Sequence, residues 1–414
     1  MSSFSIALSG LTAASSDLDV TANNVANADT VGFKSSRAEF ADVYAAGSVN
    51  LSSSTSGEGV RVDDNAQQFS QGNITTTSSN LDLAISGDGF FTLQDASGTV
   101  YSRNGEFSED KNGNVVNATG QFLQVYPPTA NGGFNTGTTT DLNLQTAQSA
   151  PAATTTAAVT LNLPADSTVP TDYAADGFVA TDPNTYNQST STTVYDSLGQ
   201  AHTATLYFTQ GATTADTSTW NVNMTVDGQK VTATPATLTF NADGAVTPAG
   251  SGLLTFSGYT PTDGADPLSM AFNFGTSTQY GGAFGVTAIT QDGYATGQLS
   301  TVNIDASGIV SAVYTNGRST QLGQLAMANF PNPQGLQQLG DTNWAQTYTS
   351  GTVVTGTAGG AGFGSIQSGA LESSNVDLTT ELVNMITAQR AFQANAQVVT
   401  TANQLSETVI NITH

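Results

Sequence analysis

The chain has 414 residues, 8 of them Lys or Arg and 32 Asp or Glu, so its formal net charge is −24. Only 10% of the residues are charged, against about 25% in a typical soluble domain. Binding to nucleic acid or to an anionic membrane requires clustered basic residues, and no two of these lie closer in sequence than Lys34 and Arg37. We therefore expect no nucleic acid partner. We also expect no membrane insertion, because no apolar run approaches the about 20 residues of a membrane helix.

Few residues are suited to catalysis or metal binding. The absence of Cys removes disulfides, thiol nucleophiles and thiolate metal sites. The chain has two histidines. His202 follows a predicted hairpin turn, and we interpret it as a strand histidine facing its neighbours or solvent. Neither a Gly-x-Ser-x-Gly elbow nor the Gly-Lys pair of a phosphate loop occurs. We expect no enzyme and no catalytic, cofactor or metal site.

The first predicted element is an amphipathic helix over residues 3–26. Apolar residues recur there at intervals of three or four, as Leu11, Leu18 and Val25 illustrate, which places them on one helix stripe. Gly32 marks the turn that follows.

The middle of the chain predicts antiparallel strands. All twelve prolines lie between Pro127 and Pro333, and proline breaks helices. Alternating apolar and polar runs are separated by turn signals that favour hairpins, at 95–98, 112–113, 196–199, 227–228, 243–244, 305–308 and 316–317.

The last predicted element is a helix over 376–412. Ser374 and Asp377 have the spacing of a capping box, and an apolar stripe follows, including Leu378, Leu382 and Met385. A helix this long needs a partner for its stripe. We expect that partner to be the N-terminal helix, in the same chain or in a neighbouring one, paired as in a coiled coil.

The expected fold is α+β and mainly antiparallel, with two or three β domains in nested order between the terminal helices. Residues 1–33 and 373–414 form a helical domain, and 34–71 with 358–372 a linker region. Residues 72–145 with 285–357 form an inner β domain, and 146–284 an inserted outer β domain.

Three parts of the chain carry distinctive motifs. The first is NNVANADTVGFK at 23–34. The second combines LDLAISGDGFFTL at 81–93 with YSRNGEF at 101–107. The third combines SGALESSNVDL at 368–378 with QRAFQAN at 389–395. In this order they resemble the bacterial flagellar rod and hook protein family. The inserted segment 146–284 is typical of the hook members, whereas distal rod proteins are shorter.

The resemblance implies a structural subunit that polymerises into a curved, flexible tube, transmitting torque from rod to filament and enclosing the export channel. The alternatives are a distal rod or other flagellar axial protein, and a non-flagellar secreted β-rich surface protein. It also implies these partners: further copies of the chain, the distal rod, hook cap and hook–filament junction proteins, and the flagellar type III export apparatus. The expected location is the extracellular hook, reached without a cleaved signal peptide.

Three sets of residues follow from this interpretation. Helix packing and polymerisation are expected of Leu8, Leu11, Leu18, Val25, Leu378, Leu382, Met385, Phe392 and Val399. The N-terminal family signature comprises Asn24, Asn27, Thr30, Gly32, Phe33 and Lys34. Phe40 and Tyr44 fit the Phe-x-x-x-hydrophobic pattern associated with the export gate.

Overall fold

The computed structural model describes residues 2–43, 57–144, 148–173, 177–214, 216–234, 236–248 and 250–412. The chain divides into two compact units. The first comprises Met1–Thr146, Thr301–Val313 and Ser319–His414, and the second comprises Ala147–Ser300 and Tyr314–Arg318. The second unit is thus largely an insertion in the first, and the α+β, mainly antiparallel class that the sequence predicts is confirmed.

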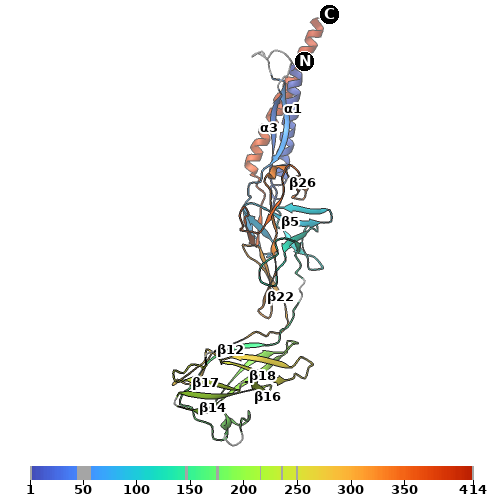
Figure 1. Cartoon of the computed structure of the whole chain (residues 1–414). Helices are drawn as coiled ribbons and strands as arrows, with labels where there is room; N and C mark the ends of the chain where they lie inside the picture. Colours follow the sequence, from blue (N-terminus) through green and yellow to red (C-terminus); the bar gives the residue numbers. More distant parts are fainter. Residues whose placement is uncertain are drawn as a thin grey trace. The chain divides into compact units, whose positions relative to one another are not determined.

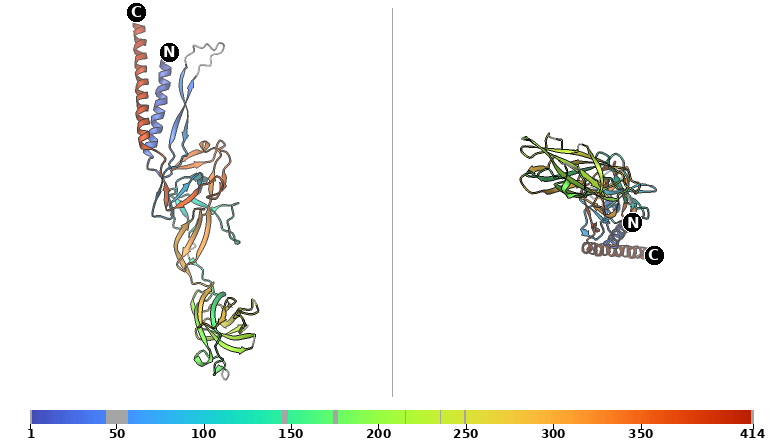
Figure 2. Two further views of the ribbon diagram at one scale, coloured as in Figure 1. Left: turned by 90° about the vertical axis from the view of Figure 1, so that its left-hand side faces the viewer. Right: turned by 90° about the horizontal axis from the view of Figure 1, so that it is seen from below.

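Helices α1 (Ser2–Ala26) and α3 (Leu378–Ile412) belong to the first unit. They pack side by side and antiparallel, with both chain ends at the same end of the pair (Figure 1; Figure 2). Their proline-free sequences allow these lengths. Both expected terminal helices are therefore present and paired within one chain.

A hairpin of β1 (Ser36–Val43) and β2 (Gly59–Gln67) runs along α1 (Figure 2). Its register shifts between Glu39 and Phe40, and such a bulge bends and twists a strand pair. Helix α1 therefore has α3 and this hairpin as neighbours.

The other strands of the first unit build one large sheet and two small ladders. The large sheet has the path β22 (Gly297–Ile304), β23 (Ile309–Tyr314), β24 (Ser319–Leu325), β9 (Phe122–Tyr126), β5 (Phe90–Asp95), β6 (Gly98–Ser102), β27 (Asn343–Ala345) and β26 (Gln337–Gly340). Off this path lie β7 (Phe107–Glu109), β8 (Val115–Asn117), β10 (Thr140–Asp141), β25 (Met327–Asn329) and β28 (Val354–Gly356). The ladders pair β3 (Ile74–Thr76) with β30 (Ala370–Glu372), and β4 (Leu83–Ser86) with β29 (Ser365–Ser368). A short helix, η2, spans Pro333–Gly335.

An aromatic cluster fills part of the core of the first unit. Phe90 lies with its ring centroid 5.6 Å from that of Trp344, and Tyr101 lies 4.9 Å from Phe330. The edge-on angles of these pairs are those that aromatic quadrupoles favour. The Trp344 indole donates to the Gln67 side chain at 2.6 Å, which ties the end of β2 to this core.

The second unit is a sheet with its own hydrophobic core. Its strand path is β13 (Gln188–Tyr195), β14 (Ala201–Thr213), β15 (Thr217–Val226), β16 (Gln229–Thr234), β18 (Leu253–Tyr259), β19 (Leu268–Asn273), β12 (Thr156–Pro164) and β20 (Thr278–Tyr280). Strand β17 (Thr237–Asn241) pairs with β15, and β21 (Gly285–Gln291) with β12. Outside this sheet are β11 (Gln148–Ser149), which pairs with residues 297–298, and η1 (Pro183–Thr185).

Alternation of buried and exposed residues along β14 and β15 supplies much of that core. Phe208, Trp220 and Phe272 are fully buried in it. Strand β12 departs from the expected antiparallel pattern, because it pairs in parallel with β19 and with β20. A parallel neighbour requires a long crossover, which the intervening strands provide.

The predicted turns are found where the glycine signals place them. Residues 95–98, 112–113, 196–199, 227–228 and 316–317 each connect two antiparallel strands. Residues 305–308 connect the neighbouring strands β22 and β23, and 243–244 forms a turn closed by the bridge between Phe240 and Val246. Gly228 and Gly317 have φ of 81° and 77°, a region that glycine enters without steric penalty.

Candidate functional site

Small side chains bring α1 and α3 close together. Ala7, Ala14 and Ala388 are buried. A Cβ atom on Gly10 would lie 2.8 Å from the side-chain oxygen of Asn395 on α3. Because the distance between helix axes depends on the side chains at the contact, these residues permit a close approach over this part of the pair.

The expected packing stripe divides into two sets. Leu11, Leu18, Val25, Met385, Phe392 and Val399 are partly buried within the chain. Leu8, Leu378 and Leu382 are 48%, 47% and 50% exposed. The first set packs inside one chain, and the second remains available on the helix surface.

Four further apolar residues of α3 were not singled out from the sequence. Val383, Ile386, Val398 and Leu405 are 58%, 50%, 47% and 63% exposed. Their apolar character was visible, but the sequence does not say which side of α3 would face α1. We call the exposed residues Leu8, Leu378, Leu382, Val383, Ile386, Val398 and Leu405 the apolar helix surface. Neither terminal helix has, over its described residues, the length and apolarity that a membrane span requires.

The cap of α3 differs from the one predicted. Asp377, not Ser374, caps the helix, since its carboxylate accepts from the Thr380 amide at 2.9 Å. That hydrogen bond is the largest influence lowering the pKa of Asp377. The Ser374 hydroxyl accepts from the Val376 amide at 3.3 Å, and among the described residues it caps no amide of the first helical turn. The helix therefore begins at Leu378 rather than at residue 376.

Two hydrogen bonds between the Asn24 side chain and the Ser36 backbone, which we call the amide clasp, hold the segment that follows α1. The Asn24 side chain donates to the Ser36 carbonyl at 2.7 Å and accepts from the Ser36 amide at 2.9 Å. Asn24 is almost completely buried. This reciprocal pair sets the start of the β1–β2 hairpin against the end of α1.

A buried ion cluster lies just beyond this clasp. Lys34 Nζ is 2.6 Å from Glu372 Oε1, and Arg103 Nη1 is 3.2 Å from Glu372 Oε2. The Lys34 and Glu372 side chains are fully buried, and that of Arg103 is 4% exposed. We call these three residues the junction cluster.

Backbone groups complete the junction cluster. Lys34 also donates to the Ser70 carbonyl at 2.8 Å, Arg103 donates to the Gly87 carbonyl at 2.8 Å, and Glu372 accepts from the Gly72 amide at 2.9 Å. Burial lowers the pKa of both Lys34 and Arg103, while the Glu372 carboxylate acts to raise each of them. The single carboxylate therefore stabilises two buried cations, and its loss would remove the counter-ion that contacts both of them.

The three sequence motifs meet at this cluster. Lys34 closes the first motif, Arg103 lies in the second and Glu372 in the third. Asn375 adds a further link, accepting from the Ser35 amide at 2.7 Å and donating to the Gln68 carbonyl at 2.7 Å. The signature residues named from the sequence include Lys34 but not Arg103 or Glu372, although both stand in the quoted motifs.

The remaining signature residues shape the turn into the cluster. Thr30 donates to the Asn27 side chain at 3.1 Å, and Phe33 is buried. Gly32 has φ of 70°, and a Cβ atom there would lie 2.5 Å from the Asn104 backbone nitrogen. Only glycine fits this position without moving the backbone.

Of the two residues expected to form the export-gate pattern, the structure describes one. Phe40 lies on β1 with 44% of its surface exposed. Tyr44 lies outside the described residues.

Models of four families match the chain in sequence order. Flagella basal body rod protein matches residues 4–34, and Flagellar hook protein FlgE/F/G D1 domain matches 84–179. Flagellar basal body protein FlaE D2 domain matches 162–294, and Flagellar basal body rod FlgEFG protein C-terminal matches 367–412.

Curated relatives match over nearly the whole chain. Flagellar hook protein FlgE of Escherichia coli (strain K12) is 41% identical over 418 residues, covering 99% of each chain. Flagellar hook protein FlgE of Rhizobium meliloti (strain 1021) is 34% identical, covering 98% of this chain and 97% of the relative. A crystal structure of Helicobacter pylori flagellar hook protein FlgE2 resembles the fold, with a TM-score of 0.53 and 12% identity over 72% of this chain and all of that chain.

Proposed function

The chain belongs to the flagellar hook protein family, and from this premise we propose that the apolar helix surface is where its copies join. The protein is a structural subunit of the hook, an extracellular structure, and the family implies self-polymerisation. The observation that carries the proposal is the exposure of apolar side chains on the two packed terminal helices.

The exposure of these apolar side chains favours the binding of a further copy of the chain to the apolar helix surface. Leu382 and Ile386 are each 50% exposed on a helix whose other side already packs on α1. Burying the remaining half of one such side chain contributes about 1 kcal/mol, and the contribution repeats in every subunit. In a polymer the helices therefore form a continuous packed layer, which we propose lines the export channel.

We propose that the β structure of both units allows the tube to bend. A joint that bends as it rotates needs subunits that slide without breaking a large apolar interface. Surfaces rich in Thr, Asn and Gln suit this, because their hydrogen bonds are easily exchanged or bridged by water. We propose that the chain has a helical domain (1–33 and 373–414), a linker region (34–71 and 358–372), an inner β domain (72–145 and 285–357) and an outer β domain (146–284). We also propose that its polymer is a curved, flexible tube that transmits torque.

Specific partners are also part of the proposal. We expect contacts with the distal rod, hook cap and hook–filament junction proteins, and export without a cleaved signal peptide through the type III apparatus, with Phe40 and Tyr44 as the candidate gate pattern. No enzymatic role is proposed. The alternative of a distal rod or other axial protein is distinguished by tube shape, which is straight for a rod.

The test is Leu382→Asp in the full-length chain, observed by electron microscopy after salt-induced polymerisation. A carboxylate at this place opposes burial, because a buried charge without a partner is strongly unfavourable. We expect that this variant forms no tubes, while the β structure of both units stays folded.

Asn384→Asp is the matched control, since it adds the same charge at an exposed polar position of the same helix. This variant is expected to polymerise. Normal curved tubes from Leu382→Asp would contradict the proposal, and straight tubes from the unmodified chain would favour the rod alternative.

A further inference from the structure

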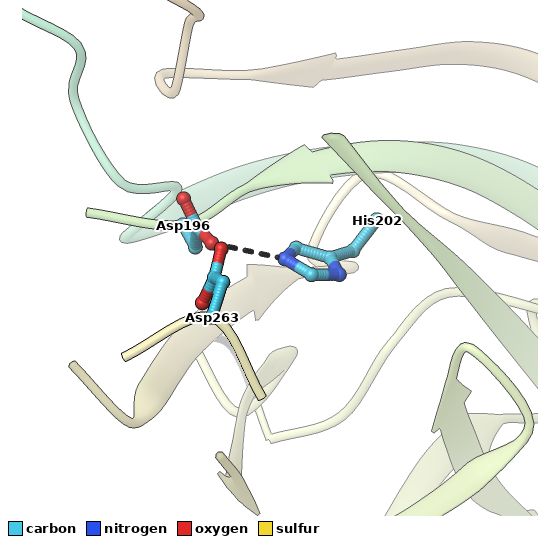
Figure 3. Close-up of side chains that lie close together, drawn as sticks. All are labelled: Asp196, His202 and Asp263. Atoms are coloured by element: carbon cyan, nitrogen blue, oxygen red, sulfur yellow. Dashed lines mark hydrogen bonds and ion pairs between the residues drawn. The ribbon is translucent and has the colours of Figure 1, made fainter. Parts of the chain in front are cut away.

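Three potential metal ligands converge in the second unit. Asp196 lies in the turn between β13 and β14, His202 is the second residue of β14, and Asp263 lies in the loop between β18 and β19. Figure 3 shows the two carboxylates facing the same nitrogen of the His202 ring. One ligand atom from each residue lies within 4.8 Å of the others.

Groups outside this set fix the orientation of the imidazole. His202 Nδ1 lies 2.7 Å from Asp227 Oδ2, and the Tyr259 hydroxyl donates to the same oxygen at 2.9 Å. This short contact favours the tautomer in which Nδ1–H donates to Asp227. A carboxylate holding the far nitrogen in this way is the usual companion of a metal-binding histidine.

With Nδ1 bonded to Asp227, the lone pair of Nε2 points toward carboxylate oxygens. Nε2 is 3.1 Å from Asp196 Oδ2. Asp196 is fully buried, and its other oxygen already accepts from the backbone amides of Leu198 and Gln200, each at 2.9 Å. Two carboxylates and a lone pair at close range repel one another unless a proton or a metal cation lies among them.

We propose that Asp196, His202 and Asp263 bind a divalent transition-metal ion of the zinc class. The 3.1 Å between Nε2 and Oδ2 is somewhat shorter than the separation of about 3.4 Å between two tetrahedral ligands that each lie about 2.1 Å from one zinc ion, so a small outward shift of the side chains admits the ion. Imidazole nitrogen selects for zinc over magnesium and calcium, which prefer all-oxygen sites. Asp263 is exposed, so water completes the coordination from its side.

The ion would join the β13–β14 turn to the β18–β19 loop, two connections far apart in sequence. Such a link stabilises the second unit independently of polymerisation, because an ion that binds only the folded state shifts the unfolding equilibrium. The site is therefore separate from the assembly surface proposed above.

Isothermal titration calorimetry of the full-length, chelator-treated chain with zinc chloride tests the proposal. We expect one saturable site per chain, a zinc-dependent rise in the unfolding temperature, and no binding of calcium or magnesium at the same concentrations. Asp263→Asn should weaken zinc binding at least tenfold. Asp227→Asn should weaken it by about 10- to 100-fold through loss of the oriented imidazole.

Asp266→Asn is the matched control, because it removes an exposed acid from the same loop but not from the ligand set. Cobalt(II) absorption of the wild-type chain should report nitrogen and oxygen ligands. The absence of a saturable site would mean that a proton alone occupies the space between Nε2 and the carboxylates, which would overturn the proposal. Equal losses of zinc affinity in Asp263→Asn and Asp266→Asn would overturn the proposal too, since they would indicate that zinc is attracted diffusely to acidic side chains.

Discussion

Lys34 is one of only eight basic residues in the chain, and it is fully buried against Glu372. A buried ion pair adds little to stability when compared with a well-packed apolar replacement. The pair does restrict the geometry, because Lys34 and Glu372 must lie within hydrogen-bonding distance of each other for both charges to be stabilised. In this chain the cluster joins residues following α1 to those preceding α3, at the base of the apolar helix surface. We infer that it fixes the register between helices and β structure.

Glu372→Gln tests the junction cluster. The substitution removes the carboxylate that contacts both the Lys34 and Arg103 cations, and breaking a buried pair in this way costs about 3 to 5 kcal/mol. We expect the urea midpoint of the first unit to fall accordingly. The chain has two tryptophans, Trp344 in the first unit and Trp220 in the second, so Trp344 fluorescence in a Trp220→Phe background reports the first unit.

Glu39→Gln provides the comparison, because the Arg37–Glu39 pair has a similar distance of 2.7 Å but side chains 68% and 44% exposed. Surface pairs contribute about 0 to 1 kcal/mol, so this variant should unfold almost as the parent does. Equal shifts in the two variants would refute the special role of Glu372.

At this scale the sequence identified Lys34 but not its partner. Glu372 lies 338 positions away along the chain, and local patterns carry no information about contacts at that separation. His202 illustrates the same limit. Its predicted place on a strand is correct, but Asp227 and Tyr259 reach it from other strand ends. Residue type suggested what each group can do, and only the fold determined what it meets.

The terminal helices were the most predictable elements. Their apolar spacing repeats over many turns and no proline interrupts it, so local sequence is sufficient to specify them. The start of α3 was less predictable, because Ser374 and Asp377 are both acceptable caps and the backbone geometry chooses between them. The parallel pairing of β12 was not predictable, since it depends on strands more than a hundred residues away.

The cap of α3 gives a pH-dependent prediction. The pKa of Asp377 is lower in the folded chain than its ordinary value of 3.8. Its stabilisation is therefore fully present above that ordinary value and is lost as the pH falls through the lower folded value. We expect Asp377→Ala to reduce helical circular dichroism at neutral pH, with the difference from wild type shrinking as the pH falls through the lowered pKa of Asp377.

Two variants separate the charge from the cap. Asp377→Asn keeps a good capping side chain without a titrating group, so it should retain helicity with no pH-dependent step of its own. Ser374→Ala should leave the helix unchanged, because Ser374 does not cap α3. Loss of helicity in Ser374→Ala, with none in Asp377→Ala, would restore the capping box that the sequence favoured.

For the whole molecule, the nested order was readable from proline and glycine content, but the extent of the insertion was not. The compact second unit runs to Ser300 in its main segment, because β21 pairs with β12 inside it. Over the part of the chain that the structure describes, its hydrophobic core draws on residues of the same unit. The unit therefore has the contacts of an independently folding domain, while α1, α3 and the junction cluster all belong to the first unit.

Replacing residues 147–300 by a short Gly/Ser linker tests whether polymerisation depends on the first unit and bending stiffness on the second. The apolar helix surface and the junction cluster lie outside the deleted segment, so we expect tubes to form under the conditions used for the full chain. We expect the second units of neighbouring subunits to contact one another in the tube, so that the deletion removes one source of bending resistance. Electron micrographs should then show altered curvature or persistence length. Trp344 fluorescence verifies that the first unit remains folded, so failure to polymerise would place an essential contact in the second unit. Tubes of unchanged stiffness would assign bending to the first unit alone.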